Sequence, residues 1–139
     1  MSMRSYAEMP KLVLPNGLYI SDTTLRDGAQ MPGIAMTKEQ QLGIFDHLHR
    51  IGIDKIELFM LDGFYRDITL EMLGREYKKP EITGWARSNR EDIDGVLHVE
   101  GIRETGILMS VSDSHIYDKM GMTREEAKRR YLDAFNYAL

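Results

Sequence analysis

Short apolar runs alternate along the chain with longer segments in which apolar residues recur every three or four positions. The runs cover residues 18–20, 55–60, 82–86 and 106–111. Apolar runs without strict alternation are typical of strands buried in a parallel sheet, whereas a spacing of three to four residues is typical of amphipathic helices. The pattern therefore predicts four strands, each followed by a helix.

The first helix has the clearest expected boundaries. Thr37 and Gln40 have the spacing of a capping box, which marks a helix start, and Gly52 is the residue type that most often ends one. The positions expected to face the core follow at helical spacing: Leu42, Phe45, Leu48 and Ile51.

Three further helices are expected, over residues 67–77, over residues 92–99 and from Thr123 onward. Pro80 closes the segment that follows the first of these. Thr123 and Glu126 repeat the capping-box spacing at the start of the last helix. The apolar stripe of that helix is Ala127, Tyr131, Ala134, Phe135 and Ala138.

The alternation of strands and helices predicts an α/β fold with a parallel sheet and right-handed crossovers. Two architectures have this order: an open doubly wound sheet, or part of a (β/α)8 barrel. A complete barrel needs about 250 residues. A chain of 139 residues therefore fits half a barrel, with four of the eight units, but length alone does not exclude a small open sheet.

The composition indicates one ordinary soluble domain. Hydrophobic residues make up 42% of the chain, which is incompatible with general disorder. The net charge of −4 disfavours nucleic acid or an anionic membrane as the main partner, and the absence of cysteine excludes disulfides and thiolate chemistry. No stretch approaches the roughly 18 apolar residues of a membrane span, so a cytoplasmic location is expected.

The densest polar segment follows the first apolar run directly. It contains Arg26, Asp27, Gly28 and Gln30, at the strand end where parallel α/β folds place their chemistry. An aspartate can bind a hard divalent cation, and an arginine offers donors for a carboxylate or a developing oxyanion. The alternative is a surface ion pair between Arg26 and Asp27 in a loop that needs Gly28.

The segment from Ser21 to Gly33, SDTTLRDGAQMPG, closely resembles the signature of the DRE-TIM metallolyase superfamily. Isopropylmalate, citramalate and homocitrate synthases, hydroxymethylglutaryl-CoA lyase and the carboxyltransferase domain of pyruvate carboxylase belong to it. The helix start at Thr37 and residues 52–57 follow at the places expected for this superfamily, and a looser resemblance extends through residues 82–87 and 112–115. The resemblance implies a (β/α)8 barrel, with residues 1–17 as a lead-in and 18–139 as the N-terminal half of the catalytic barrel.

The resemblance also implies roles for individual residues. Asp27 corresponds to a metal ligand, Arg26 to the catalytic arginine, and Glu57 to an acidic residue of the second strand that helps hold the site. A carboxylate within an apolar run is costly to bury unpaired, so Glu57 is expected to contact Arg26. Weaker candidates for substrate contacts are Gln30, Arg87 and His115, the last of which could equally be an ordinary loop histidine.

One segment departs from the superfamily pattern, and one pair of histidines has the spacing of its metal ligands without the geometry. The residues after Glu57, 58–64, differ from the turn usual in the synthases, which leaves the substrate open. His47 and His49 have the His-x-His spacing of a metal-ligand pair, but residues two apart on a helix point about 200° away from each other. A true pair is expected on a later strand, and His47, His49 and His98 are expected to be ordinary helix residues.

The function implied is that of an acyltransferase that condenses acetyl-CoA with a 2-oxo acid on a divalent metal, Mg, Mn or Zn. A lyase or carboxyltransferase of the same superfamily is one alternative, and a non-catalytic half-barrel binding module is another. The expected partners are small-molecule substrates. Because a half barrel exposes two sheet edges, the chain is expected either to form a homodimer or to be a truncated piece of a longer enzyme, inactive by itself.

Overall fold

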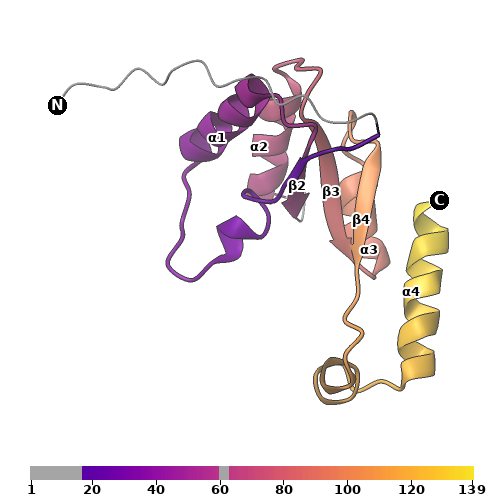
Figure 1. Ribbon diagram of the computed structural model, residues 1–139. Coiled ribbons are helices and arrows are strands. Elements are labelled where there is room, and N and C mark those ends of the chain that lie inside the picture. Colours follow the sequence, from indigo (N-terminus) through magenta and orange to yellow (C-terminus); the bar gives the residue numbers. More distant parts are fainter. Residues whose placement is uncertain (1–16, 60–62) are drawn as a thin grey trace.

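The computed structural model describes residues 17–59 and 63–139 (Figure 1). The expected lead-in, apart from Gly17, and residues 60–62, the first of which is the predicted end of the second strand, lie outside the described residues. None of the described helices is long and apolar enough to cross a membrane.

Four parallel strands form one sheet, in the order β1-β2-β3-β4. They are β1 (Ser21–Asp22), β2 (Lys55–Phe59), β3 (Glu81–Arg87) and β4 (Glu104–Leu108). The strand order follows the chain order without the reversal that defines a doubly wound sheet. The predicted parallel α/β fold is therefore confirmed, and the strand order favours the barrel over the open sheet.

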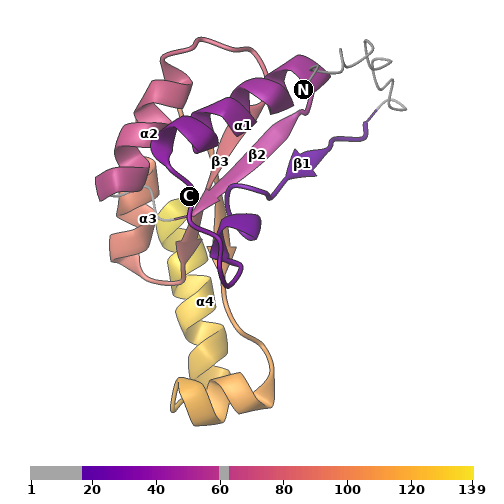
Figure 2. The same cartoon turned by 90° about the vertical axis from the view of Figure 1, so that its left-hand side faces the viewer.

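Each strand is followed by a helix. The helices are α1 (Lys38–Ile51), α2 (Gly63–Leu73), α3 (Arg90–Leu97) and α4 (Arg124–Ala138). Two short elements that the sequence pattern does not predict precede α1 and α4: a 3-10 helix, η1 (Gly28–Gln30), and a π-helix, η2 (Ser114–Lys119). Figure 1 and Figure 2 show α1 and α2 together on one side of the sheet, and Figure 1 shows α4 beside its β4 end.

The ends of α1 and the start of α4 form as the sequence predicts. The Thr37 side chain accepts a hydrogen bond from Gln40 N, and Gln40 Oε1 accepts one from Thr37 N. Gly52 ends α1 in the left-handed region, with φ at 82°, where the absence of a Cβ removes the steric penalty. Thr123 and Glu126 form the second capping box.

The two faces of the sheet differ in character. On β2, Ile56 and Leu58 are buried in the core cluster with side chains of α1, α2 and α3, whereas Lys55, Glu57 and Phe59 alternate with them. Because successive strand residues point to opposite faces, those three lie on the face away from the helices, here called the inner face. Their partners in register on β3 share that face: Glu81, Thr83 and Trp85.

Two strands differ most from the prediction, while β3 extends one residue beyond the predicted 82–86 at each end. The first predicted strand, residues 18–20, precedes the paired residues: Leu18 and Tyr19 are exposed, and pairing with β2 begins at the Ile20 carbonyl, which accepts from Asp54 N and Lys55 N. The fourth strand begins and ends earlier than the predicted 106–111. Its neighbour β3 ends at Arg87, the partner of Leu108, so later residues have no ladder to join, and Val111 is exposed.

Two helix boundaries are also shifted. The second helix was predicted over residues 67–77, but α2 begins at Gly63 and ends at Leu73, before Gly74. Tyr77 instead lies in the loop before β3 and packs against α1. The third was predicted over 92–99, but the Asn89 side chain accepts from Asp92 N and starts α3 two residues earlier. Side-chain capping, more than apolar spacing, decides that start.

Candidate active site

A tight turn after β1 presents Arg26 and Asp27 at the carboxyl end of the sheet. The Thr23 carbonyl accepts hydrogen bonds from the backbone N–H groups of the next residues in the turn, Arg26, Asp27 and Gly28. The Asp22 carboxylate accepts from Thr24 N at 2.9 Å and from Thr24 Oγ1 at 3.1 Å. The turn therefore satisfies its own backbone donors and leaves the Arg26 and Asp27 side chains for other contacts.

Arg26 reaches across to the second strand and pairs with Glu57. Arg26 Nε donates to Glu57 Oε2 at 2.6 Å, and the two side chains are only 17% and 14% exposed. Ser21 Oγ lies 3.5 Å from the other carboxylate oxygen of Glu57. The contact expected from the cost of burying a lone carboxylate is present, and the arginine pairs with more than its exposed neighbour Asp27.

Trp85 forms a third side of the arginine site and is a residue that the sequence analysis missed. The Arg26 guanidinium carbon lies 4.7 Å from the centre of the Trp85 ring, within cation–π range. Trp85 lies in register with Phe59, two residues beyond Glu57, so the register and the alternation of strand residues together place it on the inner face. Within the described residues, Arg26 Nη2 makes no hydrogen bond or ion pair and remains available to a ligand.

Asp27 is placed as an exposed carboxylate beside this cluster. Its side chain is 71% exposed, and its Oδ1 lies 3.5 Å from Arg26 Nη1. Over residues 17–59 and 63–139, no group of three or more histidine, cysteine or acidic residues is arranged to hold a metal ion. The described residues therefore do not form a complete metal site, although Asp27 has the chemistry and exposure to supply one oxygen ligand.

The weaker candidates, Gln30, Arg87 and His115, lie in three separate segments. Gln30 ends η1 with an exposed side chain. Arg87 ends β3 and donates to both carboxylate oxygens of Asp92, from Nε at 2.5 Å and from Nη2 at 2.8 Å. These bonds hold the pKa of Asp92 below its ordinary value.

His115 lies on η2, outside the Arg26–Glu57 cluster. Ser112 Oγ lies 2.8 Å from His115 Nδ1, within hydrogen-bond distance. Asp113 pairs instead with Arg124, which lowers the pKa of the Asp113 carboxyl. The three adjacent polar residues of this segment, Ser112, Asp113 and His115, do not form a catalytic relay.

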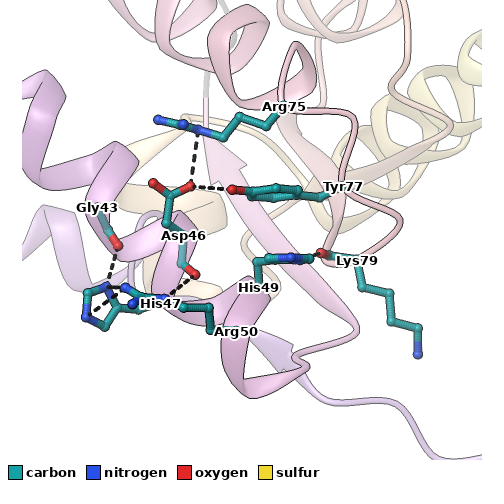
Figure 3. A network of polar contacts seen from close by, with 8 residues as sticks. All are labelled: Gly43, Asp46, His47, His49, Arg50, Arg75, Tyr77 and Lys79. Carbon is teal, nitrogen blue, oxygen red and sulfur yellow. Dashed lines mark hydrogen bonds and ion pairs between the residues drawn. The ribbon is translucent and has the colours of Figure 1, made fainter. Parts of the chain in front are cut away.

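The two histidines of α1 point to different partners, as Figure 3 shows. His47 Nδ1 lies 2.7 Å from the Gly43 carbonyl oxygen, one turn earlier in the same helix. His49 stacks on Tyr77 with ring centres 3.7 Å apart, and its Nδ1 lies 2.7 Å from the Lys79 carbonyl oxygen. His49 therefore ties α1 to the loop before β3, whereas His47 makes its contact within α1. His98 follows the last residue of α3, and its Nδ1 lies 2.7 Å from the Asp94 carbonyl oxygen.

A parallel sheet in chain order, with its charged cluster at the carboxyl edge, is typical of (β/α)8-barrel enzymes. The chain belongs to the family described as HMGL-like, a DRE-TIM barrel family, which its sequence matches over residues 17–139. This confirms the superfamily resemblance and identifies the four β/α units as the N-terminal part of such a barrel.

The similar proteins include several synthases. The chain is 40% identical to a citrate (Re)-synthase of Clostridium kluyveri, over 96% of this chain and 32% of the relative. It is 41% identical to a probable 2-isopropylmalate synthase of Ignicoccus hospitalis, over 90% and 31%, and 33% identical to a homocitrate synthase of Methanothermobacter thermautotrophicus, over 92% and 33%. The chain therefore spans about a third of the length of these relatives.

Proposed function

We propose that this chain supplies the arginine half of an active site that condenses acetyl-CoA with a 2-oxo acid. The observation that carries the proposal is the position of Arg26. Its Nε is fixed by Glu57 at 2.6 Å, one face of its guanidinium lies on Trp85, and Nη2 is unengaged within the described residues. A guanidinium so fixed is preorganised for charge that develops on a substrate oxygen.

The reaction places negative charge where Arg26 can act. A base takes a proton from the methyl group of acetyl-CoA, and the resulting carbon nucleophile bonds to the keto carbon of the 2-oxo acid. The carbonyl electron pair moves onto the keto oxygen, Arg26 stabilises that oxyanion through Nη2, and protonation then gives the hydroxyl group of the product. Water then cleaves the thioester and releases CoA as the thiol. Glu57 acts on this step indirectly, by fixing the direction of the arginine.

Asp27 is the residue of the described chain that would serve a divalent metal. When bound, such a metal supplies Lewis-acid polarisation of the keto oxygen. The other ligands would come from outside the described set, on a later strand with a His-x-His pair. Gln30, Arg87 and His115 are proposed to contact substrate at the same edge of the barrel, and the whole enzyme is proposed to be cytoplasmic and homodimeric.

The test is acetyl-CoA-dependent thiol release with the complete protein that contains this sequence. The assay uses three 2-oxo acids that differ in side chain: a short one, a branched apolar one and a dicarboxylic one. We expect thiol release that depends on one of these acids, and loss of about a hundredfold or more of kcat in Arg26→Met, the size of effect seen when an oxyanion donor is removed. An Arg90→Met variant at the surface is the matched control.

The names of the similar proteins favour condensation over the other chemistry of the superfamily, since they are synthases for citrate, isopropylmalate and homocitrate. Cleavage of an acyl-CoA, or carboxyl transfer, without acetyl-CoA-dependent thiol release would contradict the proposal and identify the lyase or carboxyltransferase. A complete protein that neither releases thiol nor cleaves an acyl-CoA would point to a binding module.

A further inference from the structure

We infer that Trp85, packed against Gly106, sets the plane of the Arg26 guanidinium. Trp85 is then a positioning residue of the proposed oxyanion site. The inference rests on the proposed function for its kinetic consequence, but not for its geometry. Three residues on three neighbouring segments carry it: Arg26 after β1, Trp85 on β3 and Gly106 on β4.

The space for the indole exists because residue 106 has no side chain. Trp85 and Gly106 are direct partners in the β3–β4 ladder. A Cβ added at Gly106 would lie 2.6 Å from Trp85 Cδ2 and Cε2 and 2.9 Å from Cε3, far inside van der Waals contact. The indole therefore lies flat over the backbone of β4, and any side chain at position 106 would displace it.

Packing, and not hydrogen bonding, fixes the indole. Trp85 Nε1 is buried and has no hydrogen-bond partner within the described residues. Gly106 supports one side of the ring, and the Arg26 guanidinium lies 4.7 Å from the ring centre. A buried indole N–H usually has an acceptor, but this one has none in the part of the chain that the structure describes. The position of the ring is therefore explained by its packing contacts and not by a hydrogen bond.

Glu57 and Trp85 constrain different degrees of freedom of the same guanidinium. The bond from Arg26 Nε to Glu57 Oε2 fixes one edge of the group but allows its plane to tilt about that bond. The face of the Trp85 ring opposes the tilt, because a cation is most stable over the face of the ring. Together the two contacts direct the unengaged Nη2 along one line, which neither contact would do alone.

The chain contains one tryptophan, so the fluorescence of Trp85 reports this geometry directly. We expect Arg26→Met to change the emission maximum or intensity of the 139-residue chain, because a cation over the ring is lost. Arg90→Met is the matched control, since Arg90 lies 4.6 Å from the ring centre of Tyr137 and does not pair with the indole in this way. Gly106→Ala should also change the emission, whereas Gly95→Ala, where an added Cβ meets nothing within 4 Å, should not.

The kinetic test uses the complete protein and substitutes the ring itself. Trp85→Leu should lower kcat by about 2- to 30-fold, the range that corresponds to one cation–π contact, with the KM for acetyl-CoA unchanged. Trp85→Phe should recover most of the loss because it keeps a ring face. Gly106→Ala should lower kcat when Trp85 is present and have little further effect in the Trp85→Leu background. Circular dichroism confirms that each variant is folded.

Emission that is the same in native protein, Arg26→Met and Gly106→Ala would overturn the inference. So would a folded Trp85→Leu variant with native kcat, or one that Trp85→Phe does not improve. If the native protein shows no acetyl-CoA-dependent activity at all, the proposed function fails, while the fluorescence comparison still decides whether Trp85 and Gly106 hold Arg26.

Discussion

Arg26 Nε lies 2.6 Å from Glu57 Oε2, and both side chains are more than four-fifths buried. A second ion pair, Lys38 with Glu71, has the same 2.6 Å separation, but its side chains are 39% and 46% exposed. Water around an exposed ion pair screens its charges and can solvate one group when the other is lost, and burial removes that water. Breaking the buried pair should therefore cost the fold more free energy than breaking the exposed pair, although the two are equally long.

Replacing Glu57 by glutamine should therefore destabilise the fold far more than the same change at Glu71. Glu57→Gln leaves a largely buried guanidinium without its counter-charge, which should cost about 1–3 kcal/mol, whereas Glu71→Gln should cost less than about 1 kcal/mol. Urea unfolding of both variants measures the difference. Equal losses would show that Arg26 is solvated well enough to dispense with Glu57.

The fold was predictable where the sequence contains local signals. The capping residues Thr37 and Thr123 and the helix stop at Gly52 form as the pattern predicts, since each acts within a few residues of itself. Strand ends were less predictable, because they depend on a neighbour distant in sequence. β4 stops at Leu108 because its partner β3 stops at Arg87, and no local property of residues 109–111 records that.

The candidate site divides in the same way. The contact of Arg26 with Glu57 could be predicted, because a carboxylate in an apolar strand needs a partner and the sequence offers one. Trp85 could not be assigned to the site without the register of β2 and β3, which depends on how the two strands align. The roles of Gln30, Arg87 and His115 remain predictions for mutagenesis.

The bond between Arg87 and Asp92 predicts a pH dependence of stability. The Asp92 side chain is 5% exposed and its pKa is lowered, chiefly by the hydrogen bond from Arg87. A carboxyl whose pKa is lower in the folded than in the unfolded state stabilises the fold above the unfolded-state pKa, about 3.9 for aspartate. This stabilisation is lost as the pH falls through the folded-state pKa.

Urea unfolding of native protein and Asp92→Asn at several pH values from 7 down to 2 tests this. We expect native protein to be more stable than Asp92→Asn at neutral pH, and we expect the difference in their free energies of unfolding to become smaller in acid. Asp118→Asn removes an exposed carboxyl and is the control, so narrowing that occurs with Asp92→Asn and not with Asp118→Asn belongs to Asp92. A difference in free energy of unfolding that stays constant with pH would mean that Asp92 takes up no proton when the protein unfolds.

Two glycines of the same helix should respond to alanine with opposite signs. Gly52 ends α1 at φ 82°, so Gly52→Ala places a Cβ in a strained backbone conformation and should cost about 1 kcal/mol. Gly43 lies inside α1, and an added Cβ there meets nothing within 4 Å, so Gly43→Ala should stabilise by roughly 0.5–1 kcal/mol. Thermal unfolding measures both, and a shift of the same sign in the two variants would contradict the assigned ends of α1.

Substitution of Asp27 should change the affinity for a divalent metal, whereas substitution of either histidine of α1 should not. His47 and His49 make contacts with different carbonyl groups and do not converge, so His47→Ala and His49→Ala should leave the affinity of the complete protein for Mg, Mn or Zn unchanged. Asp27→Asn should weaken it, because an exposed carboxylate at the carboxyl edge of the sheet is replaced by a neutral amide.

The 139-residue chain alone should bind metal weakly and not catalyse thiol release, since its described residues offer no cluster of three ligands. Isothermal titration of the native complete protein, its three variants and the chain alone with each metal is the test. Tight binding by the chain alone, or loss of binding in the histidine variants, would place the metal in a site that Asp27 does not define.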